Sequence, residues 1–174
     1  VGADLNRDHV DKLHPETQAL HKNVLQKYDI DYMIDLHHQG TQARRDGKLV
    51  SGSMLYPTNS NVKSEVVEKS KRLGSVVFNA VDSTGWGHLA KYNGGNGENI
   101  GRNGAAVQYD IATLLFEMRG MSDHSSESAI IGQKSNGYLI KQTITTLDAT
   151  VRSIADGSIE NADISFWDTL DTQK

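Results

Sequence analysis

The sequence predicts an α/β domain with a mixed, mostly parallel sheet flanked by helices. Two runs rich in apolar residues, 32–40 and 111–120, predict strands, and the first has too many consecutive apolar residues for a half-exposed strand. Apolar residues at helical spacing over residues 61–81 and 138–154 predict amphipathic helices. The chain of 174 residues is long enough for a single domain, residues 1–174, with a substantial core.

The N-terminal part of the chain predicts a helix followed directly by a strand. Pro15 in the first turn and Glu16 near the positive end of the helix dipole favour a helix start, and the apolar spacing continues to about Tyr28. The strand at residues 32–40 comes next. Because its apolar residues are nearly consecutive, we expect it to lie centrally in the sheet, covered on both sides.

The middle and the end of the chain give weaker signals. Residues 41–47 are expected to form a loop, and residues 49–56 predict a second strand that Pro57 ends. The segment from residue 120 to about residue 135 is polar. The tail at residues 156–174 contains two aromatic residues and is expected either to pack back on the domain or to fray.

A glycine-rich segment covers residues 83–104. It holds seven of the 16 glycines of the chain: Gly85, Gly87, Gly94, Gly95, Gly97, Gly101 and Gly104. Compact domains rarely contain structureless loops longer than about 12–15 residues unless these loops are functional or disordered. We therefore predict a loop that faces the substrate.

The composition narrows the classes of partner. The 18 basic and 22 acidic residues give a net charge of −4 and are scattered along the chain, so the cationic patch that sustains nucleic-acid binding is not expected. No stretch approaches the roughly 20 apolar residues of a membrane helix. The chain has no cysteine, so a metal would have to be held by histidine and carboxylate side chains.

The start of the chain says little about location. Residues 1–4 do not begin a signal peptide, because no charged start is followed by an apolar stretch. The chain is expected to begin inside a domain, so the sequence does not predict the cellular compartment. A periplasmic or secreted parent protein is compatible with the sequence. The oligomeric state is not predicted.

The end of the first strand offers a candidate metal ligand. Zinc needs neutral imidazole nitrogens on a rigid backbone, which the end of a buried strand supplies. A single histidine is more often structural, but His37 lies in an Asp-Leu-His-x-x-Gly context with Asp35 and Gly40. His38 is the alternative, because adjacent strand residues point to opposite faces.

The end of the second apolar run offers a candidate general base. Glu117 follows six apolar or small residues, so we expect its carboxyl group to be partly desolvated, which raises its pKa. A base with a raised pKa suits deprotonation of a metal-activated water. The alternative is a surface acid paired with Arg119, which lies on the same face of the strand.

The beginning of the chain offers a candidate anion-binding pair. The guanidinium group of Arg7 can bind a carboxylate through two parallel hydrogen bonds, and the amide of Asn6 adds a donor. The pair suits recognition of the C-terminal carboxylate of a peptide. An Asn-Arg dipeptide alone is usually a solvated turn, so its value depends on its place in the order of motifs.

The three segments together resemble the later part of the zinc carboxypeptidase family. Members of this family have, in order, a His-x-x-Glu pair of zinc ligands, an arginine that polarises the scissile carbonyl, an Asn-Arg dipeptide, a third ligand histidine, a tyrosine on a mobile loop, and a glutamate base followed by x-Arg. Residues 2–7, 34–37 and 115–119 match the Asn-Arg, third-ligand and base elements. The match extends over residues 2–120 and implies a carboxypeptidase-like domain that is incomplete at its N-terminal side.

The resemblance implies roles for the candidate residues. Asn6 and Arg7 would dock the substrate terminus, His37 would be one of the ligands of Zn²⁺, and Glu117 would be the base. Tyr92, in the glycine-rich segment, is the better match for the loop tyrosine, whereas Tyr109 is expected to lie in the core. Arg102 resembles an arginine that faces the substrate in bacterial members, although a solvated loop cation is the alternative.

The chain also departs from the family pattern. Neither the His-x-x-Glu pair nor the carbonyl-polarising arginine precedes Asn6. His124 and Glu127 have the spacing of a ligand pair but follow the base, so they are expected to be surface residues. Catalytic zinc sites use about three protein ligands, and the other two ligands are expected upstream of Val1.

The sequence therefore predicts zinc-dependent hydrolysis of a C-terminal peptide bond in a peptide or protein substrate, with little activity of this chain alone. A relative that binds peptide termini without catalysis is one alternative. An amidohydrolase of N-acyl amino acids is the other. The side-chain specificity is not predicted.

Overall fold

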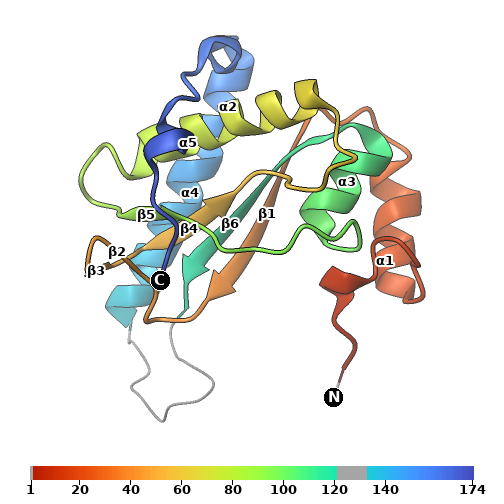
Figure 1. Ribbon diagram of the computed structural model, residues 1–174, viewed down its shortest axis with the longest axis horizontal. Helices are drawn as coiled ribbons and strands as arrows, with labels where there is room; N and C mark the ends of the chain where they lie inside the picture. The colour runs from red at the N-terminus through yellow and green to blue at the C-terminus, as the bar shows by residue number, and fades with distance from the viewer. Residues whose placement is uncertain (1, 121–132) are drawn as a thin grey trace.

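The structure is a computed structural model that describes residues 2–120 and 133–174 (Figure 1). In chain order the elements are η1 Leu5–Arg7, α1 Pro15–Leu20, the π-helical turn η2 His21–Leu25, β1 Tyr32–Gln39, β2 Arg44–Arg45, β3 Lys48–Leu49, β4 Gly52–Leu55, α2 Ser64–Val81, β5 Leu89–Lys91, α3 Gly101–Tyr109, β6 Ala112–Arg119, α4 Gln133–Ala155, η3 Ser158–Asn161 and α5 Phe166–Thr169.

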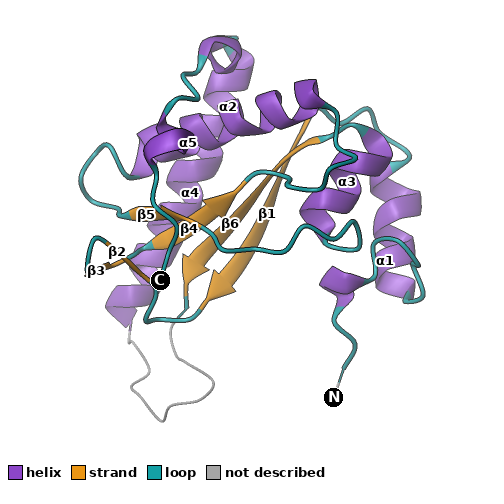
Figure 2. Ribbon diagram, in the orientation of Figure 1, coloured by secondary structure: helices purple, strands orange, loops and turns teal. Residues whose placement is uncertain are grey.

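The main sheet has the strand order β1-β6-β4-β5. β1 and β6 are parallel, β4 and β5 are parallel, and β6 and β4 are antiparallel. Helices α2 and α4 lie against one face of this sheet, and α3 packs on the other face (Figure 2). The predicted α/β class, with a mixed and mostly parallel sheet flanked by helices, is confirmed.

The main core lies between the sheet and α2. Leu114, Phe116 and Met118 of β6 project into it and pack with Leu73 and Val77 of α2. Side chains alternate along a strand, so the next residues of β6 project to the opposite face, where α3 lies. A smaller cluster on that face joins α3 and η2 to the sheet.

The buried inner strands are β6 and β4, and not β1. Ala112 to Met118 are all buried, whereas β1 is the edge strand of the sheet within the described residues and has exposed side chains at Leu36 and His38. The prediction of a central position for β1 was therefore wrong. Its apolar residues are consecutive because Ile34 packs on the main core while Met33 packs on the cluster of the opposite face, so helices rather than strands account for them.

The glycine-rich segment is not a continuous loop. β5 lies within this segment and pairs with β4, and the last residues of the segment form the first turn of α3. Glycines in this turn permit close packing: a Cβ atom on Gly104 would lie 2.8 Å from the carbonyl oxygen of Glu98. The prediction of a loop over residues 83–104 holds only for the parts between these elements.

Other boundaries also differ from prediction. The first helix ends in a π-helical turn at Leu25, and the strand expected at residues 49–56 is split between β3, which forms a small hairpin with β2, and β4. The tail packs back on the domain through Trp167, which is buried and donates its indole N–H to the carbonyl oxygen of Lys71 at 3.0 Å. His124 and Glu127 lie outside the described residues.

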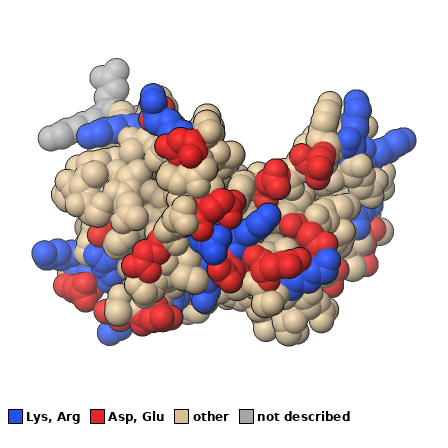
Figure 3. All heavy atoms as spheres, turned by 90° about the horizontal axis from the view of Figure 1, so that it is seen from above, with Lys and Arg blue, Asp and Glu red and all other residues tan. Residues whose placement is uncertain are grey.

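The surface shows mixed charge. Basic and acidic side chains are interspersed on the face shown in Figure 3, as the scattered charges of the sequence predict. Among the helices of the described residues, none is both long and apolar enough to span a membrane.

Two helical glycines provide a matched test of the packing of α2. A Cβ atom on Gly74 would lie 2.3 Å from Cζ2 of Trp167, whereas one on Gly137 in α4 would meet nothing within 4 Å. We expect Gly74→Ala to lower the free energy of unfolding by about 1–3 kcal/mol through overpacking. Gly137→Ala should raise it by about 0.5–1 kcal/mol through helix propensity. Urea denaturation measures both, and a stabilising Gly74→Ala substitution would contradict the packing of Trp167 on α2.

Candidate active site

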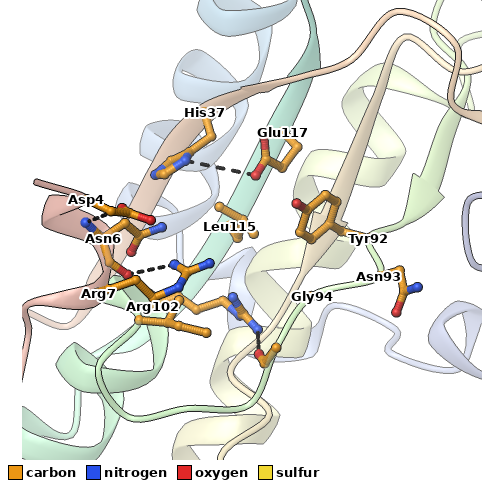
Figure 4. Close-up of a pocket in the computed structure, with 12 residues that line it drawn as sticks. Asp4, Asn6, Arg7, His37, Tyr92, Asn93, Gly94, Arg102, Leu115 and Glu117 are labelled. Atoms are coloured by element: carbon orange, nitrogen blue, oxygen red, sulfur yellow. Dashed lines mark hydrogen bonds and ion pairs between the residues drawn. The ribbon is translucent and has the colours of Figure 1, made fainter. Parts of the chain in front are cut away.

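A cavity of about 340 Å³ opens at the carboxyl ends of β1 and β6. Its lining comes from five separate parts of the chain: the segment around η1, the end of β1, the segment after β5, the start of α3, and the end of β6. The side chains that face it are predominantly polar (Figure 4). The cavity brings together all six residues that the sequence singles out: Asn6, Arg7, His37, Tyr92, Arg102 and Glu117.

The pairing of β1 with β6 places His37 opposite Glu117. The two residues are register partners on adjacent parallel strands. Nδ1 of His37 lies 3.9 Å from Oε1 of Glu117, which is too far for a hydrogen bond. The imidazole and the carboxylate therefore face each other without being joined, on the same side of the cavity (Figure 4).

Asp35 fixes the ring of His37. It precedes His37 by two residues on β1, so both side chains lie on the same face, and its Oδ1 atom is 2.9 Å from Nε2 of His37. A hydrogen bond at Nε2 assigns the proton of the neutral ring to that nitrogen, which leaves the lone pair of Nδ1 free towards Glu117. The same hydrogen bond is the main cause that raises the pKa of His37 above its usual value.

Glu117 is a buried carboxyl group with one unsatisfied oxygen. Its side chain is 8% exposed, and Oε2 has no hydrogen-bond partner among the described residues. Burial raises the pKa of Glu117, and the positive charge that His37 can carry opposes this effect. The desolvation expected from the apolar run is present, and an incompletely paired carboxyl group with a raised pKa is suited to proton transfer.

The Asn-Arg pair lies in η1, on the far side of the cavity from Glu117. Oδ1 of Asn6 accepts a hydrogen bond from the backbone N–H of Gly101 at 2.7 Å, which ties η1 to the start of α3. The backbone N–H of Asn6 donates to Oδ1 of Asp4 at 3.0 Å. Arg7 is exposed, and within the described part of the chain its side chain bonds only the backbone carbonyl of Asn6, so most of its guanidinium donors stay free for an anion.

Tyr92 and Tyr109 occupy different surroundings. Tyr92 follows β5 and lines the cavity, and burial, followed by the charge of Glu117, raises the pKa of its hydroxyl group. Tyr109 is at the end of α3, and its hydroxyl oxygen lies 2.7 Å from Nδ1 of His21. Tyr109 packs on the smaller core cluster, in agreement with the expectation for this residue.

Arg102 lies in the first turn of α3 and is almost fully buried, with 1% exposure. It is therefore not the solvated loop cation that the sequence left as an alternative. The guanidinium group reaches the cavity from this helix, whereas a loop position was expected. A run of glycines beside the arginine concealed the helix.

His38 is directed away from the cavity. It is exposed and is the register partner of Met118, whose side chain projects into the main core on the opposite face of the sheet. Of the two histidines at the end of β1, only His37 lines the cavity. No group of three His, Cys, Asp or Glu residues capable of holding a metal ion occurs within the described residues.

Sequence reasoning missed two residues next to the site. Asp35 was noted only as part of a motif, although its i, i+2 spacing from His37 on a strand is a readable signal of a shared face. His9 carries no such signal. A Cβ atom on Gly101 would lie 3.1 Å from Oδ1 of Asn6, 3.1 Å from Nε2 of His9 and 3.3 Å from Oδ2 of Asp35, so these polar atoms converge on Gly101.

The arrangement offers an imidazole nitrogen, a proton-accepting carboxylate and two guanidinium groups around one small cavity. Such a set can hold a metal in part, transfer a proton and bind an anionic group. Comparisons with protein-family models, with curated proteins and with solved structures gave no match. The chemistry of the cavity therefore carries the functional interpretation.

The contact between Asp35 and His37 predicts a pH dependence of the metal-free chain. We expect Asp35→Asn to lower the pKa of His37, because the anionic acceptor at Nε2 is lost. A histidine with a raised pKa stabilises the fold below its usual pKa of 6.5, and this contribution disappears as the pH rises through the folded-state value. The substitution should therefore destabilise the fold more at pH 5.5 than at pH 8.5.

NMR titration of the His37 ring protons and urea unfolding at the two pH values provide the measurements. Asp31→Asn is the matched control, since Asp31 is exposed immediately before the same strand. An unchanged titration of His37 in Asp35→Asn would show that the two side chains are not in contact.

Proposed function

We propose that the cavity is part of a zinc-dependent carboxypeptidase-type active site, which hydrolyses the C-terminal peptide bond of a peptide or protein. The observation that carries this proposal is the approach of Nδ1 of His37 to a buried, incompletely bonded Glu117 carboxyl group on the neighbouring strand. The resemblance of the segments around Asn6, His37 and Glu117 to zinc carboxypeptidases supports the same function.

The donor set fits one part of a zinc site. His37 has a fixed ring orientation and a free Nδ1, which is the arrangement of ligand histidines held by a carboxylate at their other nitrogen. Zinc, when bound, would polarise the scissile carbonyl group and lower the pKa of water. The described residues supply one ligand, and we propose that the other two are the His-x-x-Glu pair of the family, outside this sequence. This chain alone should then have little activity.

The proton transfers are assigned to Glu117. Burial raises its pKa, which makes the carboxylate a stronger base towards the attacking water. The same carboxyl group then delivers this proton to the nitrogen of the leaving amino acid, so that the C–N bond breaks and the base is regenerated. Nδ1 of His37 lies 3.9 Å from Oε1 of Glu117 without bonding it, so the carboxylate remains available.

The remaining residues position the substrate. The free donors of Arg7, together with the amide of Asn6, bind the terminal carboxylate. The amide oxygen of Asn6 is already occupied by the N–H of Gly101, which orients the amide N–H₂ group. Tyr92 lines the same cavity after β5 and would close over the bound residue.

Two other functions each have one observation in their favour. A module that binds peptide termini without metal is compatible with described residues that contain no three-ligand group. A polypeptide that also contains the proposed upstream ligands would then purify without stoichiometric zinc. An amidohydrolase of N-acyl amino acids agrees with a cavity of about 340 Å³, at the small end of ligand pockets. Rates for peptides and N-acyl amino acids, measured side by side, separate this enzyme from a carboxypeptidase.

Glu117→Gln tests the base through two readouts. In the zinc-loaded polypeptide that includes the upstream ligands, we expect peptide hydrolysis to fall by about 10²–10⁴-fold. In this chain, the same substitution should raise the free energy of unfolding at pH 7, because a buried carboxyl with a raised pKa destabilises the fold once it ionises. The gain should vanish below the usual pKa of 4.5, where both states are protonated.

Glu65→Gln, at an exposed position in the first turn of α2, is the control for both measurements. Unchanged hydrolysis in Glu117→Gln would remove Glu117 as the base. An increase in stability without a loss of activity would identify a buried carboxyl group that has no catalytic role.

A further inference from the structure

Arg102 is a buried cation without a carboxylate partner. It is 1% exposed, and Nη2 of its guanidinium group donates to the carbonyl oxygen of Gly95 and, at 3.4 Å, to the hydroxyl oxygen of Thr58. Neither Nε nor Nη1 bonds a described residue. Both acceptors are neutral, so the positive charge is not compensated by direct contact. Burial accordingly lowers the pKa of Arg102.

A purely structural role would not require this charge. Attachment of the Gly95 segment to α3 uses one nitrogen of the guanidinium group, and a neutral donor would supply the same hydrogen bond. Burial of an unpaired charge is costly, and buried arginines are normally paired or hydrogen-bonded throughout. Arg102 lines the cavity, so the missing partner is expected to be a bound anion.

The cavity contains a second guanidinium group. Arg7 lines it as well, on the same side as Arg102 and across from His37 and Glu117 (Figure 4). After burial, the charge of Asp35 favours ionisation of Arg102, as does that of Glu117, whereas the charge of Arg7 opposes it; neither carboxylate contacts the guanidinium group. One monocarboxylate would satisfy only one of the two arginines. A ligand with two carboxylates would compensate both charges, and each fork can bind a carboxylate through two hydrogen bonds.

We propose that the site selects substrates whose C-terminal residue has an acidic side chain, with Arg7 on the terminal carboxylate and Arg102 on the side-chain carboxylate. This specificity rests on the proposed function, because it assumes that a C-terminal residue occupies the cavity. Arg102 is then the residue that determines the side-chain preference. The predominantly polar lining of the cavity agrees with a charged rather than an apolar side chain.

Binding of matched dipeptides to this chain tests the preference without requiring activity. Acetyl-Ala-Glu and acetyl-Ala-Gln differ by one ionised group, and calorimetric titration or NMR shift perturbation gives their affinities. We expect the glutamate ligand to bind about 10- to 100-fold more tightly, as a charge-assisted hydrogen-bonded pair would provide. Arg102→Met should bring this ratio close to one.

Two further variants keep the result interpretable. Arg152→Met, at an exposed site of α4, should retain the full ratio. Arg102→Lys retains the charge without the planar fork, so an intermediate ratio is expected, and this variant replaces Arg102→Met when circular dichroism shows that the latter does not fold. Equal affinities of the two ligands for the native chain, or no binding of either, would overturn the proposal.

Amidated ligands distinguish failure of the specificity from failure of the proposed function. Acetyl-Ala-Glu-amide lacks the terminal carboxylate, and Arg7→Met lacks its proposed partner. An amide that binds as tightly as the free acid would remove terminal-carboxylate docking, and a preference for glutamate that remains would still support Arg102 as an anion site. A preference for the free terminus without a preference for glutamate would support docking and remove the acidic specificity.

Discussion

The register between β1 and β6 is the constraint on which the site depends. It pairs His37 with Glu117, and both strands end at the same edge because they run parallel. Side chains alternate along a strand, so a slip of β1 by one residue would direct His37 to the face covered by α2 and bring His38 to the cavity. Tyr32 and Ile34 of β1 pack on the main core and would have to leave it in such a slip, so their packing opposes it. The core thus determines which histidine meets the glutamate.

Burial of charged side chains at the site has a cost in the free energy of folding. Glu117 and Arg102 are both nearly inaccessible to solvent, and each has a polar atom without a partner among the described residues. Uncompensated polar groups of this kind oppose folding and are tolerated where binding or catalysis uses them. The rest of the domain offsets this cost through apolar packing between the sheet and α2, remote from the cavity. The apolar packing that stabilises the fold and the polar cavity therefore lie on opposite faces of one sheet.

Much of this arrangement was readable in the sequence, and the failures have physical causes. β6 and α2 were predictable because long apolar runs and strong helical spacing leave few alternatives. The edge position of β1 was not predictable. An apolar run indicates that both faces of a strand are buried, but it does not indicate whether the strand has neighbours on both sides in the sheet. The start of α3 was hidden because Gly101 and Gly104 serve close packing, whereas glycine in a sequence normally indicates a turn. Asn6, His37, Glu117 and Tyr92 stood out through motif order, but the buried, unpaired state of Arg102 needed coordinates.

The hydrogen bond between Asn6 and Gly101 has a consequence for how the site is assembled. It joins residues 95 positions apart in the chain, and Asn99 donates to the carbonyl oxygen of Arg7 over a similar separation. Contacts between such distant residues close large loops, and the loss of chain entropy delays them until the intervening elements are ordered. A chain that has formed its local helices would still lack the cavity wall formed by η1 and the start of α3, which we propose docks a carboxylate. Recognition should therefore arise only in the last cooperative step of folding, together with the native topology.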